Sequence, residues 1–267
     1  MHRPDLDLEM TTKEHIIMNQ TSTAQFTDST TVANATSAAS GGTATTSAFW
    51  DGLWRKSGIQ FVVFFIITAF IYGYQPGVGA SADVLAAFYS GNSTRILIAA
   101  ALFSFNTLNL LWFAAALRTT LADAGKDGWG AAATASSTAF GAMFLLLVSV
   151  SATLAYSIAN SGNGALTSGL NDFTWVAVVL SSFPRAMLIM AGSFGLWRAG
   201  LISNTLFAAG VTAMALTLLG ATTWMSDGFW APSGAYSRFV SPVIGLAWVA
   251  VASQILSSRI QAARAGW

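Results

Sequence analysis

Six long apolar stretches dominate this sequence of 267 residues and leave few alternatives for its fold. A helix needs roughly 20 mostly apolar residues to cross a hydrocarbon core about 30 Å thick. Only 9% of the residues are charged, against about 25% in an average soluble domain. The stretches cover residues 57–74, 95–117, 131–158, 173–197, 201–225 and 239–258. We therefore predict an all-α fold, a polytopic transmembrane helix bundle of six spans over residues 48–267.

Residues 1–47 differ sharply from the remainder of the chain. This segment is rich in Ser and Thr and contains both histidines, His2 and His15. It has too little apolar surface to offset the entropy lost on ordering. We expect a disordered cytoplasmic tail, which is either a flexible extension or a docking segment for a partner.

Basic residues near the ends of the spans predict the orientation, because positively charged flanks resist translocation. Two of them, Arg95 and Arg238, lie on the side opposite the N-terminus. Seven lie on the side of the N-terminus: Arg55, Lys56, Arg118, Lys126, Arg198, Arg259 and Arg264. Both termini are therefore expected in the cytoplasm.

Two of the outer loops carry apolar residues. After Ser81, a typical N-cap, Val84, Leu85, Phe88 and Tyr89 share one face of a short helix, which we expect to lie along the membrane interface. The loop 226–238 is rich in aromatic residues, which favours an anchor at the headgroup level, with a ligand lid as the alternative.

A series of short motifs resembles a known group of membrane proteins. The motifs are Ser81-Ala82-Asp83-Val84, Phe88-Tyr89, Arg95-Ile96-Leu97, Leu111-Trp112-Phe113, Leu117-Arg118, Phe183-Pro184 and Trp197-Arg198-Ala199-Gly200. Together they resemble uncharacterised bacterial multi-pass membrane proteins that are grouped as a domain of unknown function. The resemblance covers most of residues 58–259 and implies an inner-membrane protein of about six helices, with no assigned activity or cofactor. Arg185 is not part of the shared pattern.

Arg185 is the only charged side chain expected in the middle of a span. Such residues are costly in the bilayer and usually face a bundle interior or a wet cavity. One interpretation is structural: Pro184 should kink the helix, and the guanidinium could then bond the freed carbonyls around Leu180 and Ser181. The other is a binding site for an anionic group or a lipid headgroup.

Asn106 and Asn109 are the other polar residues at depth. They are three residues apart, so they share one face of the second span. Amides in this arrangement commonly form hydrogen bonds between helices. A polar cavity shared with Arg185 is the alternative interpretation.

Several classes of function lack the residues that they require. No histidine lies in a span to ligate haem or a catalytic metal, there is no cysteine, and no lysine or carboxylate is expected at depth. A net charge of +1 gives no field to attract nucleic acid. We therefore predict neither a metal nor another cofactor, and no enzymatic activity.

Two functions remain. The first is a non-enzymatic accessory or structural component of the inner membrane, whose partners are the bilayer and either other membrane proteins or further copies of itself. The alternative is a protein that binds or conducts a lipid-like or anionic small molecule, with Arg185, Asn106 and Asn109 in a polar cavity beside Pro184.

Overall fold

The computed structural model describes residues 56–265, and the side chains of residues 56–258. The predicted tail, and with it Arg55 and the side chains of Arg259 and Arg264, lies outside the described residues. The described part is all-helical, without a β-strand. Its α-helices are α3 (Ser57–Tyr72), α4 (Ala82–Tyr89), α5 (Ser93–Asp123), α6 (Asp127–Thr153), α7 (Gly164–Leu180), α8 (Ser182–Arg198), α9 (Asn204–Leu219) and α10 (Ser241–Ala265).

Five helical segments are long and apolar enough to cross a membrane. They are Ser93–Asp123, Asp127–Ile158, Gly164–Arg198, Asn204–Thr222 and Tyr236–Ser258. Helix α3 is apolar but has only 16 residues, a length of about 24 Å at 1.5 Å per residue. By length and composition, the described helices fit a membrane protein.

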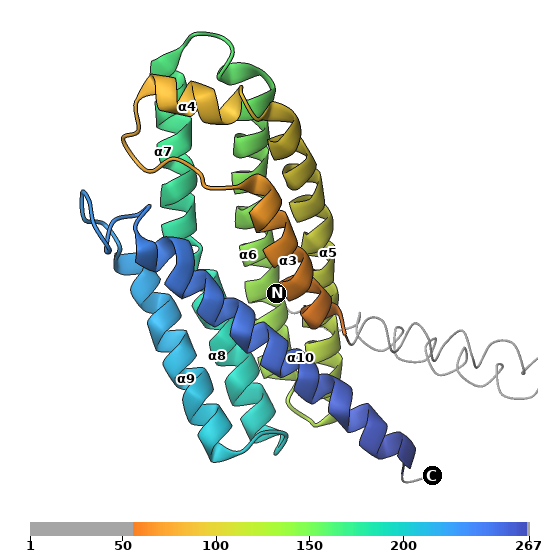
Figure 1. Ribbon diagram of the computed structural model, residues 1–267. Helices are drawn as coiled ribbons and strands as arrows, with labels where there is room; N and C mark the ends of the chain where they lie inside the picture. Colours follow the sequence, from red (N-terminus) through yellow and green to blue (C-terminus); the bar gives the residue numbers. More distant parts are fainter. Residues whose placement is uncertain (1–55, 266–267) are drawn as a thin grey trace, which may run out of the picture. The chain divides into compact units, whose positions relative to one another are not determined.

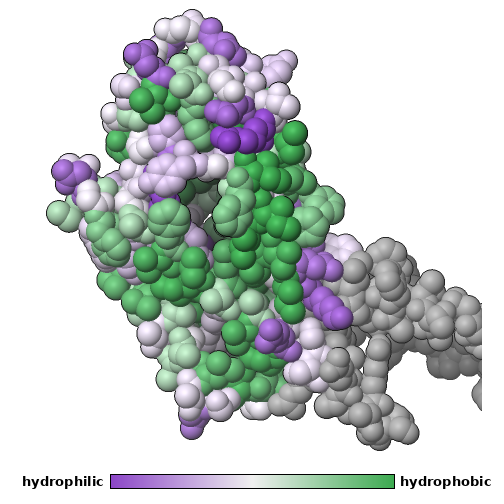
Figure 2. Space-filling view, viewed as in Figure 1, coloured by the Kyte–Doolittle hydropathy of each residue, from purple (hydrophilic) through white to green (hydrophobic). Residues whose placement is uncertain are grey.

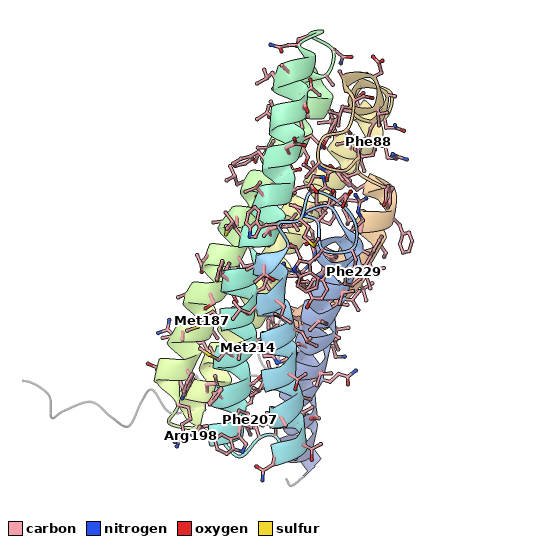
Figure 3. All side chains as sticks on the ribbon, turned by 90° about the vertical axis from the view of Figure 1, so that its left-hand side faces the viewer. Phe88, Met187, Arg198, Phe207, Met214 and Phe229 are labelled. Carbon is pink, nitrogen blue, oxygen red and sulfur yellow. The ribbon has the colours of Figure 1, made fainter. Side chains whose placement is uncertain are left out.

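Helices α5 and α6 pack side by side, with α3 in front of them and α10 crossing diagonally (Figure 1). The main core lies where α3, α5, α8 and α10 meet, and Phe113, Leu117, Leu188 and Leu256 are almost completely buried there. In Figure 3, Arg198 and Phe207 lie near one end of the bundle and Phe88 lies toward the other.

Helix α4 packs part of its apolar face against the rest of the protein. The side chains of Leu85 and Tyr89 are fully buried in a cluster with Ile96 and Leu154, whereas Val84 is 52% exposed. Helices α5 and α7 and the end of α6 cover this part of the face, and the position of α4 along the membrane interface stays a prediction.

Two single π-helical turns interrupt the regular geometry. One, η1, covers Leu154–Ile158 at the end of α6, and the other, η3, covers Tyr236–Val240 directly before α10. Isolated π turns of this kind are often found at functional sites. The second one carries Arg238.

Candidate functional site

A cavity of about 600 Å³ lies among α3, α5, α6, α7, α8 and α10. Its wall is mostly apolar, and Phe103, Phe140 and Phe144 form much of the inner surface. Figure 2 shows a hollow on this face, between the hydrophobic surface over α3 and that over the start of α10. The volume falls within the range of about 300–1,000 Å³ that is usual for small-molecule sites.

Two arginines are the only charged residues that line this cavity. Arg185 comes from the first turns of α8, and Arg238 comes from η3. No Asp or Glu is among the lining residues. Within the described part of the chain, the recorded ion pair is Arg118–Asp127 at 3.8 Å, which involves neither arginine of the cavity. Among the described residues, the two positive charges of the cavity therefore have no carboxylate counter-ion.

Arg185 is positioned by an interruption of the long helix. Helix α7 ends at Leu180 and α8 begins at Ser182, which places Pro184 in the first turn of α8, where its missing N–H costs no helical bond. The guanidinium reaches back over this break: Nε donates to the Ser181 carbonyl at 3.3 Å, and Nη2 donates to the Val178 carbonyl at 3.5 Å. The structural interpretation of Arg185 predicts the bond to the Ser181 carbonyl, whereas among the described residues the guanidinium has no hydrogen bond to the Leu180 carbonyl.

The rest of the Arg185 side chain still faces the cavity. Nη2 also donates to Ser182 Oγ at 3.0 Å, and the guanidinium carbon lies 5.9 Å from the centre of the Phe140 ring. The side chain is 9% exposed. None of the hydrogen bonds recorded among the described side chains uses Nη1. Arg185 therefore braces the break and keeps donor capacity for a ligand.

Arg238 lies against two aromatic rings that also line the cavity. Its guanidinium carbon is 3.8 Å from the centre of the Tyr74 ring and 4.6 Å from that of Trp175. Nη1 donates to the Gln75 carbonyl at 2.8 Å, and Nε donates to the Ser233 carbonyl at 3.3 Å. These contacts join η3 to the segment that follows α3.

The two guanidiniums approach neighbouring turns of α7. Arg185 contacts the carbonyl of Val178, and Arg238 lies over the ring of Trp175, three residues earlier. Three residues correspond to a rise of about 4.5 Å along a helix. Both arginines therefore lie against the same stretch of α7, on one wall of the cavity.

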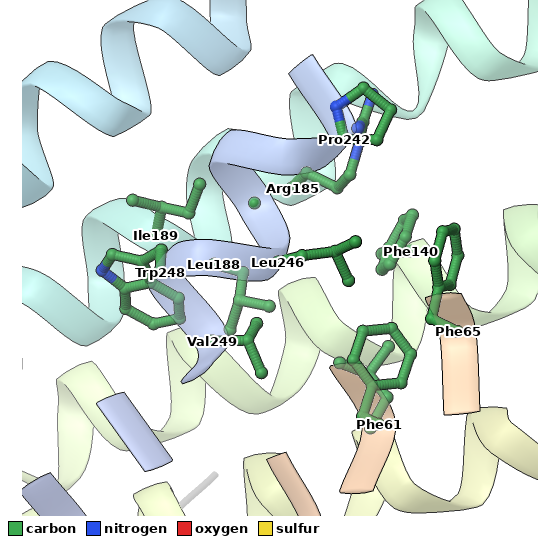
Figure 4. Close-up of a pocket in the computed structure, with 12 residues that line it drawn as sticks. Phe61, Phe65, Phe140, Arg185, Leu188, Ile189, Pro242, Leu246, Trp248 and Val249 are labelled. Carbon is green, nitrogen blue, oxygen red and sulfur yellow. The ribbon is translucent and has the colours of Figure 1, made fainter. Parts of the chain in front are cut away.

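A smaller cavity of about 50 Å³ continues past Arg185 toward the core. Figure 4 shows Arg185 beside Pro242, with Phe61 and Phe65 on one side and Trp248 on the other. Its wall is almost entirely apolar, which suits the end of a hydrocarbon chain and not a charged group.

Asn106 and Asn109 lie elsewhere. Asn106 is fully buried and donates to the Phe61 carbonyl at 3.0 Å, and Asn109 donates to Asn106 Oδ1 at 3.2 Å. Neither residue lines the two cavities at Arg185. The pair connects α5 to α3, as expected for amides that join helices.

A polar network holds the end of the cavity that Arg238 closes. Gln75 Nε2 donates to Thr174 Oγ1 at 2.7 Å and to Tyr89 Oη at 3.1 Å, and Trp175 Nε1 donates to the Pro76 carbonyl at 2.8 Å. Burial raises the pKa of Tyr89, which keeps its phenol neutral. The segment after α3 is thereby attached to α7.

The sequence did not single out Arg238, Gln75 or Trp175 as site residues. Arg238 counted only as a flanking charge of the third outer loop, yet the structure places it in the π turn that leads into α10. Its position between Tyr74 and Trp175 depends on residues about 60 and 160 positions away in the sequence, so no local pattern could have revealed it.

Comparisons with protein-family models, with curated proteins and with solved structures find no match to this chain.

Proposed function

We propose that this protein binds an anionic, lipid-like molecule in the cavity lined by Arg185 and Arg238. One observation carries the proposal: two arginines, which have no carboxylate partner in the part of the chain that the structure describes, line a single, mostly apolar cavity of about 600 Å³. This supports the binding alternative from the sequence. The accessory or structural role stays a prediction, as does the absence of enzymatic activity.

The charges favour an acidic ligand. A cation in a membrane interior is expensive, and its cost falls when an opposite charge or hydrogen-bond acceptors lie beside it. Arginine presents a planar fork of donors that matches carboxylate and phosphate groups. An acidic head group at Arg185 and Arg238 would supply the missing counter-charge.

The apolar walls favour a ligand with a hydrocarbon chain. Phe65, Phe103, Phe144 and Leu246 offer rings and aliphatic groups but no donors. The small apolar cavity beyond Arg185 lengthens this surface. A small hydrophilic anion such as free phosphate would leave most of the wall without a partner.

The same proposal includes a topology. We place six spans in the inner membrane of the cell, also called the cytoplasmic membrane, with α3 as the first span and both termini in the cytoplasm. The excess of Lys and Arg on the side of the N-terminus supports this orientation. At about 24 Å, α3 could cross if the bilayer thins locally. Membrane-impermeant labelling of Ser40→Cys and Ser161→Cys in intact cells checks the orientation, because only Ser161→Cys should react from outside.

Binding is tested with a fluorescent fatty acid and the matching neutral fatty alcohol. Truncating one partner of a buried charge pair costs about 2–5 kcal/mol, so Arg185→Gln and Arg238→Gln should each weaken fatty-acid binding by about thirtyfold or more. The alcohol should bind weakly and show little response to either substitution.

Arg118→Gln is the matched control, because it removes the same charge from an exposed side chain outside the cavity. It should leave the Kd unchanged. Equal affinity for acid and alcohol, or an equal loss in the Arg118→Gln variant, would show that the cavity arginines do not select an acidic head group. Competition by millimolar inorganic phosphate alone would point to a soluble anion instead.

A further inference from the structure

We infer that the ligand enters sideways from the bilayer, through a window between α3 and the start of α10. The inference rests on the proposed function and adds the route by which a lipid-like molecule reaches the two arginines. The window lies on the side of the segment after α3, which is the outer leaflet in the proposed topology.

Helices α3 and α10 meet at one end and separate toward the other (Figure 1). At the joined end the contact is very close: a Cβ atom on Gly58 would lie 2.8 Å from the Cβ of Ser253 and 2.7 Å from a ring carbon of Phe113. At the other end, residues from the last turns of α3 and the first turns of α10 line the cavity instead of packing together. The two helices thus form a V whose open part leads into the cavity.

The residues at the edges of this opening are apolar and exposed. Phe70 on α3 is 83% exposed, and Phe239 and Val243 at the start of α10 are 53% and 60% exposed, although all three also line the cavity. Arg185 and Trp175, farther inside, are 9% and 5% exposed. Apolar edges around a pocket that contains charged groups suit entry from hydrocarbon, not from water.

The end of the V nearest the headgroup layer is bridged. Arg238 spans it by donating to the Gln75 carbonyl and by lying on the Tyr74 ring. Trp175 fixes the same segment through the Pro76 carbonyl. A molecule coming from water would have to break these contacts, whereas one coming from the bilayer meets exposed apolar side chains such as Phe70, Phe239 and Val243.

This geometry selects the class of ligand. A single hydrocarbon chain can pass between the two helices and carry its acidic head group along the edge to Arg238 and then Arg185. Because α3 and α10 are in close contact at Gly58 and Ser253, the opening is confined to the last turns of α3 and the first turns of α10, a length that suits one hydrocarbon chain. We therefore assign a single-chain acidic lipid as the occupant.

The window is tested by obstructing it chemically. The chain has no cysteine, so Phe70→Cys and Val243→Cys each give one thiol that a bulky maleimide can modify. Reconstituted protein receives a fluorescent fatty acid from donor vesicles, and energy transfer from tryptophan reports binding. Modification should slow both association and dissociation by about tenfold or more, because an obstructed route raises the barrier in both directions, whereas a label that only weakened the bound state would speed dissociation.

Two labelled controls define the route. The control labels are attached to Val63→Cys and Val78→Cys. Val63 lies on α3 and is 49% exposed without lining the cavity, and Val78 lies in the segment beyond the contacts of Arg238 with Tyr74 and Gln75. Neither label should change the rates. Unchanged rates with labels at Phe70→Cys and Val243→Cys, or slowing by the Val78→Cys label, would overturn the lateral route. In that case the Arg185→Gln and Arg238→Gln results would still decide the binding function separately, and failure of the unmodified protein to bind the fatty acid would remove the function itself.

Discussion

Replacing Arg185 with methionine should not substantially destabilise the ligand-free protein. The side chain forms three recorded hydrogen bonds, and the shortest, at 3.0 Å, goes to Ser182 Oγ. Both carbonyls that it contacts keep another donor. Ser181 Oγ donates to the Val178 carbonyl at 2.7 Å, and the backbone N–H of residue 185 donates to the Ser181 carbonyl at 3.2 Å. Only Ser182 Oγ would lose its partner.

The balance of free energies follows from these contacts. Loss of one hydrogen bond to a charged group costs about 1.5–3 kcal/mol. Removing an arginine from the centre of a span returns about 2.5–3.5 kcal/mol on insertion scales. Methionine also fills part of the volume with a flexible apolar chain. The free energy of unfolding of the Arg185→Met variant should therefore lie between about 0.5 kcal/mol below and about 2 kcal/mol above that of the wild type.

The measurement is a thermal or denaturant unfolding curve of delipidated protein in detergent, followed by tryptophan fluorescence. Delipidation matters because a bound ligand stabilises only the form that binds it. Arg118→Met serves as the control and should change the free energy of unfolding by less than about 0.5 kcal/mol, since exposed ion pairs contribute little. A loss of about 2 kcal/mol or more in Arg185→Met would refute this reasoning and make the arginine chiefly a structural brace.

Three further predictions concern packing and pH. Gly245→Met should weaken binding of long-chain fatty acids more than of short-chain ones in fluorescence titrations. The reason is that Gly245 lines the small cavity and has open space around its Cβ position, which the methionine side chain would fill. Gly169→Met, which is also in open space but does not line this cavity, should leave the affinity for both unchanged. Gly192→Ala should lower stability by about 1–3 kcal/mol in thermal melts, since its Cβ would overlap the Trp248 ring, whereas Gly169→Ala should not. Above pH 10, the free energy of unfolding should fall in the wild type and fall less steeply in Tyr89→Phe. Burial raises the pKa of Tyr89 in the folded protein. The stability that the neutral phenol contributes is therefore complete below the usual tyrosine pKa and is lost as the pH rises above it. Equal slopes for the two proteins between pH 8 and pH 11 would contradict the last prediction.

Hydropathy located the helices well because bilayer thickness imposes both their length and their composition. The break beside Pro184 and the backward reach of Arg185 follow from local rules for proline and for helical side chains. The predicted helix ends were less accurate. Helix α5 continues to Asp123, beyond the predicted end at Leu117, so its last turns extend past the apolar run on which the prediction was based.

The cavity could not be predicted in the same way. It exists because α3 and α10 separate and because the non-helical segment after Gly73 turns back to α7, where Gln75 reaches Thr174. These are tertiary choices between distant parts of the chain. The same limit explains α4, whose apolar face could have met either lipid or protein by pattern alone.

The direction in which Arg238 points depends on how many residues the π turn before α10 contains. An α-helix advances about 100° per residue, and a π turn accommodates one residue more than an α turn. Shortening Tyr236–Val240 by a single position would swing the guanidinium roughly a quarter of a revolution about the helix axis, away from Trp175. A deletion that alters no atom of the arginine itself would then leave the cavity with half of its positive charge.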